Sequence, residues 1–273
     1  MYTNENPQQL LETAEQQLRD NPADEKAIYY KGIALNELGR NHEALCCFDK
    51  LLQNNSEHPG FWYHKGIVLI DLGRYDDAIK CFKKALSINQ DLSWAFNNIA
   101  FSLIQLNRQQ EALHYITKAI EANSDNLEAW INKASLLDDI KMHHEALECI
   151  GSAIAIDPSN EVALYNKGNI LRHLNRYSEA IESYEKALRI RENYYDAQNN
   201  KGLVYKKIGK FYDALDCFDK AIQIDKQNSD AWNNKGLTLR IIGDHDRAIK
   251  CLKEAKRLGD SNAEKNLKKF YNE

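Results

Sequence analysis

Apolar residues recur along this chain three or four positions apart, in short blocks separated by polar turns. That spacing places them on one face of a helix, so each block predicts an amphipathic helix. The blocks come in pairs, and a residue suited to a left-handed helix cap ends the first block of most pairs. These residues are Gly39, Gly73, Asn107, Asn175, Gly209 and Gly243. The pattern predicts a series of helix–turn–helix hairpins.

The hairpins repeat every 34 residues, and seven units fit without a gap: 25–58, 59–92, 93–126, 127–160, 161–194, 195–228 and 229–262. Position 20 is always alanine: Ala44, Ala78, Ala112, Ala146, Ala180, Ala214 and Ala248. Position 8 is always Gly or Ala, and position 24 is always large and apolar. Small residues let the two helices approach closely while the large ones fill the remaining space. Stacked hairpins can bury apolar faces that a single hairpin leaves exposed.

The segments outside the repeats are predicted to cap the stack. Residues 1–24 form an N-terminal capping helix, a half-repeat with Leu11 and Ala14 on its apolar face. Residues 263–273 form a C-terminal capping helix, in which Leu267 and Phe270 cover the last repeat. Caps with a polar outer face are what a stacked repeat array needs to stay in solution.

The unit resembles the tetratricopeptide repeat. The run Asp230-Ala-Trp-Asn-Asn-Lys-Gly236, followed by Ala248, Leu252 and Ala255, carries the resemblance, which covers residues 25–262. It implies an all-α fold: a right-handed superhelical solenoid of antiparallel helix pairs with a capping helix at each end. One departure is Gln198, at a position where Trp62, Trp130 and Trp232 stand in other repeats. We therefore expect looser packing around the first helix of the sixth repeat.

Composition narrows the possible functions. The chain has 36 Lys and Arg against 40 Asp and Glu, a formal net charge of -4, which disfavours binding to nucleic acid or to an anionic membrane. No uninterrupted apolar run reaches the length of a transmembrane helix. The N-terminus lacks the basic and apolar segments of a secretory signal, so we expect a cytoplasmic protein with reduced cysteines.

Catalytic motifs are missing from the sequence. It has no Gly-rich phosphate loop, no GxSxG, no HExxH and no clustered set of His, Cys and carboxylate residues. We interpret the run His143-His144-Glu145 as a solvated turn, because adjacent helical residues point in different directions. We therefore expect no enzyme, no cofactor and no metal, but a protein–protein interaction scaffold or adaptor.

The family resemblance implies that the first helix of each repeat lines a concave groove, with positions 2, 5, 6, 9, 12 and 13 facing a ligand. Position 6 carries five successive asparagines: Asn98, Asn132, Asn166, Asn200 and Asn234. An Asn amide both donates and accepts, so it can hold the backbone of an extended peptide. The row is similar to the asparagine ladder in the repeat domains of O-linked N-acetylglucosamine transferases. The alternative is that Asn is simply the common family residue at this position.

The ends of this groove differ in character. Tyr63, Trp94 and Phe101 give the N-terminal part an aromatic, apolar track, whereas Arg172, Lys206 and Arg240 at position 12 make the C-terminal part basic. These residues predict a peptide or protein segment as the partner, apolar with an acidic end. The alternatives are that winding of the superhelix or the N-terminal helix covers the apolar track, and that the basic residues are ordinary solvated surface.

Two other possibilities bear on the partner. The family's clamp for chaperone C-termini needs Lys at position 5 and Arg at position 6, and no repeat of this chain has either. The groove could also receive a helix from another copy of the chain, which would make the protein a self-assembling structural protein.

Overall fold

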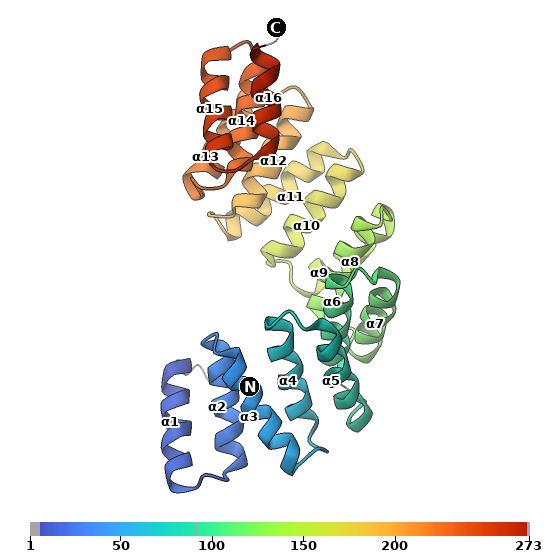
Figure 1. Cartoon of the computed structure of the whole chain (residues 1–273). Helices are drawn as coiled ribbons and strands as arrows, with labels where there is room; N and C mark the ends of the chain where they lie inside the picture. Colours follow the sequence, from blue (N-terminus) through green and yellow to red (C-terminus); the bar gives the residue numbers. More distant parts are fainter. Residues whose placement is uncertain (1–5, 91, 272–273) are drawn as a thin grey trace. The chain divides into compact units, whose positions relative to one another are not determined.

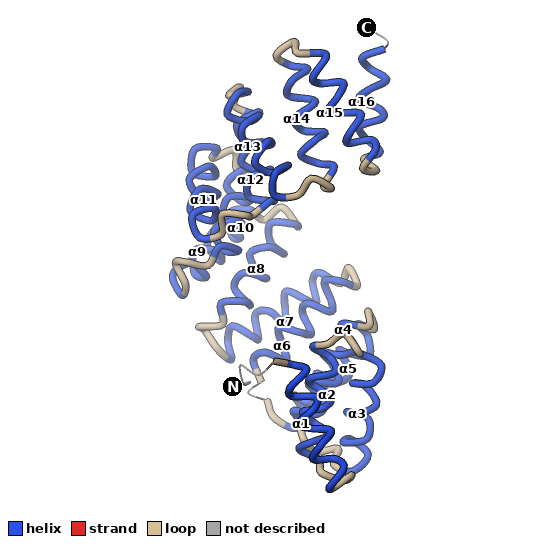
Figure 2. Tube along the Cα trace, turned by 90° about the vertical axis from the view of Figure 1, so that its left-hand side faces the viewer, coloured by secondary structure: helices blue, strands red, loops and turns tan. Residues whose placement is uncertain are grey.

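The computed structural model describes residues 6–90 and 92–271, and these residues form sixteen helices and no strand (Figure 1). The helices are α1 (Pro7–Asp20), α2 (Glu25–Glu37), α3 (Asn41–Asn54), α4 (Pro59–Asp71), α5 (Tyr75–Ile88), α6 (Ser93–Gln105), α7 (Gln109–Ala122), α8 (Leu127–Asp139), α9 (His143–Ile156), α10 (Glu161–His173), α11 (Tyr177–Ile190), α12 (Tyr195–Lys207), α13 (Phe211–Ile224), α14 (Ser229–Ile241), α15 (His245–Arg257) and α16 (Ser261–Tyr271). Short loops join them (Figure 2).

The chain divides into two compact units, Met1–Lys133 and Ala134–Glu273, with the division inside α8. Within each unit a helix packs mainly against its neighbours in sequence, as α4 does against α5 and α12 against α13. First helices of successive pairs also touch, as α4 and α6 do. This is the packing of an all-α solenoid of helix pairs, as predicted.

A helix packs on the outer side of the first and of the last helix pair. Helix α1 lies against α2 and buries Leu11 and Ala14, while α16 lies against α15 and buries Leu267. The side chain of Phe270, which we also expected to contact the last repeat, lies outside the described residues.

The predicted left-handed caps are confirmed. The φ angles are +75° at Gly39, +71° at Gly73, +56° at Asn107, +59° at Asn175, +78° at Gly209 and +84° at Gly243. The following backbone amide then reaches back into the helix, as from Arg74 N to the Leu69 carbonyl oxygen at 2.8 Å. The fourth hairpin adopts the same turn with Lys141, at a φ of +67°. The sequence pattern did not reveal this cap, since Lys rarely adopts this conformation.

Glycine at position 8 makes close helix packing possible. A Cβ atom added to Gly66 would lie 2.6 Å from the Phe82 ring, and one added to Gly202 would lie 2.6 Å from the Phe218 ring. Both rings are completely buried. The aromatic residue at position 24 therefore occupies the space that a side chain at position 8 would need.

Tryptophan at position 4 donates a hydrogen bond to the loop that precedes its helix. The Nε1 group of Trp62 donates to the Ser56 carbonyl oxygen at 2.7 Å, and that of Trp130 donates to the Ser124 carbonyl oxygen at 2.8 Å. Gln198 stands at this position in the sixth repeat, where its buried Oε1 has no hydrogen-bond partner among the described residues. A pocket of about 280 Å³ adjoins it, but a pocket of about 290 Å³ also adjoins Trp62, so the pockets do not distinguish the two positions.

Within the described residues, no helix has the length and apolar character needed to cross a membrane.

Candidate functional site

The first helices of unit Met1–Lys133 carry an aromatic surface, which we define as Tyr63, Trp94, Asn98 and Phe101. Positions 94, 98 and 101 follow one face of α6, and Trp94 and Phe101 are each 38% exposed. The Tyr63 ring on α4 meets the Trp94 ring edge-on, with centroids 3.9 Å apart. The Asn98 amide donates to the Tyr63 hydroxyl at 3.3 Å. This contact orients an aromatic pair that remains open to solvent.

His64 lies beside this surface, in an aromatic environment. Its ring stacks on Phe48 at 5.9 Å and meets Tyr29 and Tyr63 edge-on at 5.3 and 5.1 Å. Burial lowers the pKa of His64 to about 4. The imidazole is therefore neutral at physiological pH, and this part of the face is apolar.

The asparagines of position 6 bond from one repeat to the preceding one. The Asn132 amide donates to Asn97 Oδ1 at 3.0 Å, Asn200 to the Tyr165 hydroxyl at 3.1 Å, and Asn234 to Asn199 Oδ1 at 3.1 Å. In each pair the acceptor stands at position 5 of the preceding repeat. The amide nitrogens thus stabilise the stacking, and the side-chain oxygens are the groups left to accept hydrogen bonds from a ligand.

Asn166 differs from the rest of this row. The preceding repeat has Ile131 at position 5, which has no side-chain oxygen to accept a hydrogen bond. In the part of the chain that the structure describes, the Asn166 side chain makes no hydrogen bond to protein. Both its amide nitrogen and its oxygen are therefore available.

Unit Ala134–Glu273 carries a basic pocket between α10 and α12. It has a volume of about 440 Å³ and is lined by Arg172, His173, Asn175, Tyr177, Leu203, Val204, Lys206 and Lys207. Burial lowers the pKa of Lys206, and no carboxylate of the described residues pairs with it. Arg172 has a buried Nε atom without a hydrogen-bond partner among those residues. Two partly desolvated cations without a counter-ion favour an anion in this pocket.

The structure brings Arg172 and Lys206 to this pocket but leaves Arg240 outside it, on α14. The equal spacing of the three residues in the sequence could not distinguish them. Asn175, in the turn after α10, and Tyr177, the first residue of α11, also line the pocket, and neither stands at an expected ligand position.

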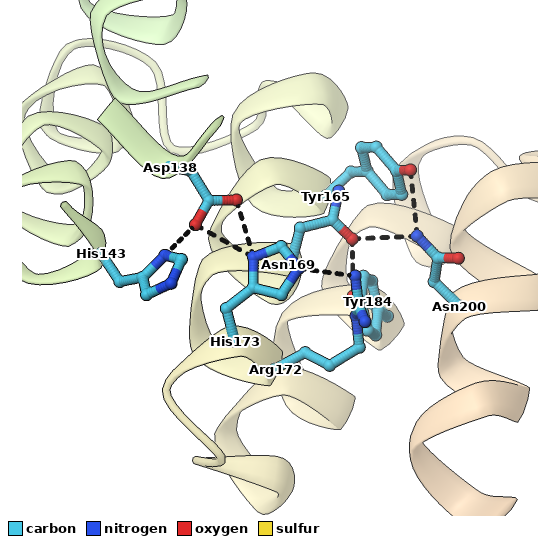
Figure 3. A network of polar contacts seen from close by, with 8 residues as sticks. All are labelled: Asp138, His143, Tyr165, Asn169, Arg172, His173, Tyr184 and Asn200. Carbon is cyan, nitrogen blue, oxygen red and sulfur yellow. Dashed lines mark hydrogen bonds and ion pairs between the residues drawn. The ribbon is translucent and has the colours of Figure 1, made fainter. Parts of the chain in front are cut away.

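A polar network extends from the pocket along the first helices (Figure 3). Asn169 Oδ1 accepts hydrogen bonds from the Tyr184 hydroxyl at 2.7 Å and from the Asn200 amide at 2.9 Å. Burial raises the pKa of Tyr184, whereas the charge of Arg172 acts in the opposite direction. Sequence reasoning did not single out Asn169, although it stands at position 9, one of the expected ligand positions.

Only one group of side chains within the described residues has the composition and spacing to hold a metal ion. It combines Asp138, His143 and His173. The interpretation of His143-His144-Glu145 as a solvated turn was wrong, because the run begins α9 and His143 contacts Asp138. The expectation that no His and carboxylate side chains cluster was also wrong, since this group forms only when separate helices pack together.

Four family models match the chain. Three are described as tetratricopeptide repeat and match residues 60–92 and 195–228, 149–182 and 217–250, and 95–126 and 127–160. The fourth, described as TPR repeat, matches residues 168–209. Together they cover most of the chain. The chain belongs to the tetratricopeptide repeat family.

Solved structures of tetratricopeptide repeat proteins share this fold. The Cut9–Hcn1 hetero-tetramer of APC/C matches with a TM-score of 0.72 and 16% identity over 96% of this chain, which spans only 52% of that chain. A protein from Parabacteroides merdae matches with 0.71 and 14% identity, covering 89% of this chain and 97% of its own. YrrB matches with 0.55 and 24% identity, covering 70% and 99%. A search of curated proteins finds no match.

Proposed function

We propose that this tetratricopeptide repeat protein is a non-catalytic scaffold that binds an extended segment of a partner protein along the first helices of its repeats. The basic pocket receives a carboxylate or phosphate of the partner, and the aromatic surface receives apolar side chains. The repeat fold itself is that of a protein–protein interaction scaffold, and YrrB is described as a TPR protein with an unusual peptide-binding site.

The basic pocket is the observation that carries this proposal. A solvated lysine on a surface has its full hydration, whereas Lys206 is partly buried and its pKa is lowered as a result. The pocket also contains the buried Nε of Arg172. An incoming anion would restore the interactions that both cations lose on folding, and it would gain charge-assisted hydrogen bonds.

The aromatic surface contributes to affinity through the apolar area that a partner would bury. Trp94 and Phe101 expose large apolar area, and aromatic anchors of this type often cost about 2 kcal/mol or more of binding energy when truncated. The position 6 asparagines add acceptors for backbone N–H groups. Asn166 adds a donor as well, since its side chain makes no hydrogen bond within the described residues.

The alternative occupant is a helix from another copy of the chain. Such a helix would use the same apolar contacts, and the protein would then self-associate. Sedimentation over a concentration series separates the two possibilities, because a scaffold for other proteins remains monomeric and a self-assembling protein does not.

The proposal includes a cytoplasmic location, where thiols stay reduced. Burial raises the pKa of Cys81 and of Cys217 to about 11, so neither thiol forms much reactive thiolate at neutral pH.

Peptide selection tests the proposal without a known partner. A random 15-residue peptide library displayed on phage would be selected on the wild-type protein and on the triple variant Arg172→Glu, Lys206→Glu, Arg240→Glu. We expect acidic peptides from the wild type and not from the variant. Synthetic copies of the selected peptides should bind at least about tenfold more weakly to Trp94→Ala.

A matched charge control is available on the second helices. Lys186→Glu, Lys220→Glu and Lys250→Glu make the same change of net charge at exposed positions. This control should select the same peptides as the wild type. Salt should slow association with the wild type, since exposed ion pairs act mainly on orientation and rate. Selection of the same peptides by the wild type and the triple variant would contradict the proposal.

A further inference from the structure

Three helices of unit Ala134–Glu273 bring an aspartate and two histidines together (Figure 3). Asp138 lies near the end of α8, His143 is the first residue of α9, and His173 is the last residue of α10. His143 Nδ1 is 2.6 Å from Asp138 Oδ1. His173 Nδ1 lies 3.0 and 2.9 Å from the two Asp138 oxygens. One atom from each side chain thus lies within 4.8 Å of the other two.

We propose that Asp138, His143 and His173 form a binding site for a divalent transition-metal ion of the zinc class. Two imidazole nitrogens and one carboxylate oxygen are ligands that Zn²⁺ and Co²⁺ accept, and three protein ligands leave one coordination position open. Ligand atoms around a tetrahedral zinc ion lie about 3.3 Å apart, given bonds of about 2.0–2.1 Å. The observed oxygen–nitrogen distances of 2.6–3.0 Å are shorter than this value, so the side chains would have to move apart to admit the ion.

The environment of the three residues also suits a cation. The side chain of Asp138 is 11% exposed, that of His143 24% and that of His173 37%, so the cluster is sheltered but reachable from solvent. Asp139, the next residue in the chain, adds a second negative charge, which repels that of Asp138. A bound dication would relieve this repulsion between the two carboxylates.

Arg172 disfavours metal binding through its contact with His173. Its guanidinium nitrogen lies 3.0 Å from His173 Nε2. Because a guanidinium only donates, Nε2 accepts, and the ring proton of His173 sits on Nδ1 and is donated to Asp138. A metal on Nδ1 would move that proton to Nε2, and Arg172 would have to turn away. Arg172 therefore acts as a competitor whose removal should tighten metal binding.

The ligands come from two successive repeats, since His173 follows Asp138 by 35 residues. A bound ion would tie α10 to α8 and α9. Because the metal binds the folded site and not the separated ligands, binding should raise the stability of this unit. This inference requires no partner protein, so it stands or falls separately from the proposed function.

Titration calorimetry on chelator-treated full-length protein tests the site, with Zn²⁺ as the probe. We expect one equivalent to bind, with each imidazole remaining neutral because its ring proton moves from Nδ1 to Nε2. His143→Gln and His173→Gln should each weaken binding at least about tenfold. His144→Gln, at the exposed neighbouring position, is the matched control and should bind as the wild type does.

Two further measurements distinguish the loss of a metal ligand from misfolding of a variant. Arg172→Gln keeps all three ligands and should bind Zn²⁺ more tightly than the wild type. Co²⁺ should give visible d–d absorption without the intense thiolate band that cysteine ligands produce. Absence of Zn²⁺ binding by the wild type, equal binding by both histidine variants and the wild type, weaker binding by Arg172→Gln, or a thiolate band would each overturn the proposal.

Discussion

At the scale of single residues, Lys141 is the clearest departure from the repeat pattern. It adopts a φ of +67° in the turn where other repeats have Gly or Asn. A side chain in this conformation costs about 1 kcal/mol, because Cβ approaches the neighbouring carbonyl oxygen. The turn places the Met142 backbone N–H 2.8 Å from the Leu137 carbonyl oxygen, the same capping hydrogen bond that the Gly and Asn turns make.

Replacing this residue tests the cost. We predict that Lys141→Gly raises the free energy of unfolding by about 0.5–1 kcal/mol, measured by urea denaturation. Gly73→Lys, at the equivalent position of the second repeat, should lower it by at least as much. Loss of stability in Lys141→Gly would show that the Lys141 side chain contributes more than the turn costs.

His64 makes stability depend on pH. Its pKa is about 4 in the folded chain, against an ordinary value of about 6.5 in the unfolded chain. Between these values the unfolded state binds a proton that the folded state does not, so stability falls as the pH falls from 6.5 toward 4. The full shift corresponds to at most about 3 kcal/mol.

His64→Asn should remove this dependence while restoring the usual residue at position 6. We predict that the urea midpoint of His64→Asn falls less than that of the wild type between pH 7 and pH 4.5. His42→Asn serves as the control, because His42 is exposed. If His42→Asn and His64→Asn flatten the curve equally, the burial of His64 does not cause the effect.

At the scale of helix pairs, positions 8 and 24 compensate one another in volume. Gly32, Gly66, Gly168 and Gly202 face Phe48, Phe82, Tyr184 and Phe218, whose rings a glycine Cβ would touch at 2.5–2.8 Å. Where position 8 is Ala, as at Ala100 and Ala134, position 24 is the smaller Ile116 or Ile150. Six repeats therefore solve one packing problem in two ways, and the seventh departs from both, because Gly236 faces Leu252.

A double-mutant cycle tests this compensation. We predict that Gly66→Ala destabilises the protein by about 1–3 kcal/mol through overpacking. Gly66→Ala combined with Phe82→Ile should cost clearly less than the sum of the single changes, because it reproduces the Ala100 and Ile116 pair. Thermal denaturation measures each variant.

Gly151 provides the control for this cycle. It lies in α9 with nothing near the site of an added Cβ, so Gly151→Ala should stabilise the protein by about 1 kcal/mol. Additive effects of Gly66→Ala and Phe82→Ile would mean that the two residues do not compete for space.

At the scale of the molecule, contacts between helices are local. Within each unit, helices pack against their neighbours in sequence and, in several repeats, against the corresponding helix of the next pair. A repeat array of this kind is stabilised by nearest-neighbour interfaces and can open locally. The loss of local stability that a mutation causes should therefore decrease with distance along the chain from the mutated repeat.

Hydrogen exchange followed by mass spectrometry can measure that decay. We predict that Gly66→Ala speeds exchange most in α4 and α5, less in α3 and α6, and not measurably in α14 and α15. Equal acceleration in all helices would show that the chain unfolds as one cooperative body.

Much of this fold could be predicted because the repeat presents the same pattern many times. Ala at position 20, Gly or Ala at position 8 and the cap near position 15 depend on interactions within one hairpin, which lie close in sequence. Looser packing at Gln198 stays a prediction, based on the loss of the indole donor that Trp62 and Trp130 use to bond the preceding loop.

The candidate site depends on contacts between repeats. The sequence pattern does not predict which side chains make those contacts. Equal spacing grouped Arg172 with Lys206 and Arg240, but only the first two share a pocket. The asparagine row was equally visible, yet whether an amide is already bonded depends on the residue at position 5 of the preceding repeat.

By itself, then, the sequence determined the helix pairs, their period and the family, because these follow from local spacing and residue size. Only the tertiary structure decided which side chains meet. Asp138, His143 and His173 lie on three helices, and their meeting depends on side-chain directions after one repeat has stacked on the next. A linear pattern records positions along each helix, and it does not record how the side chains of separate helices converge.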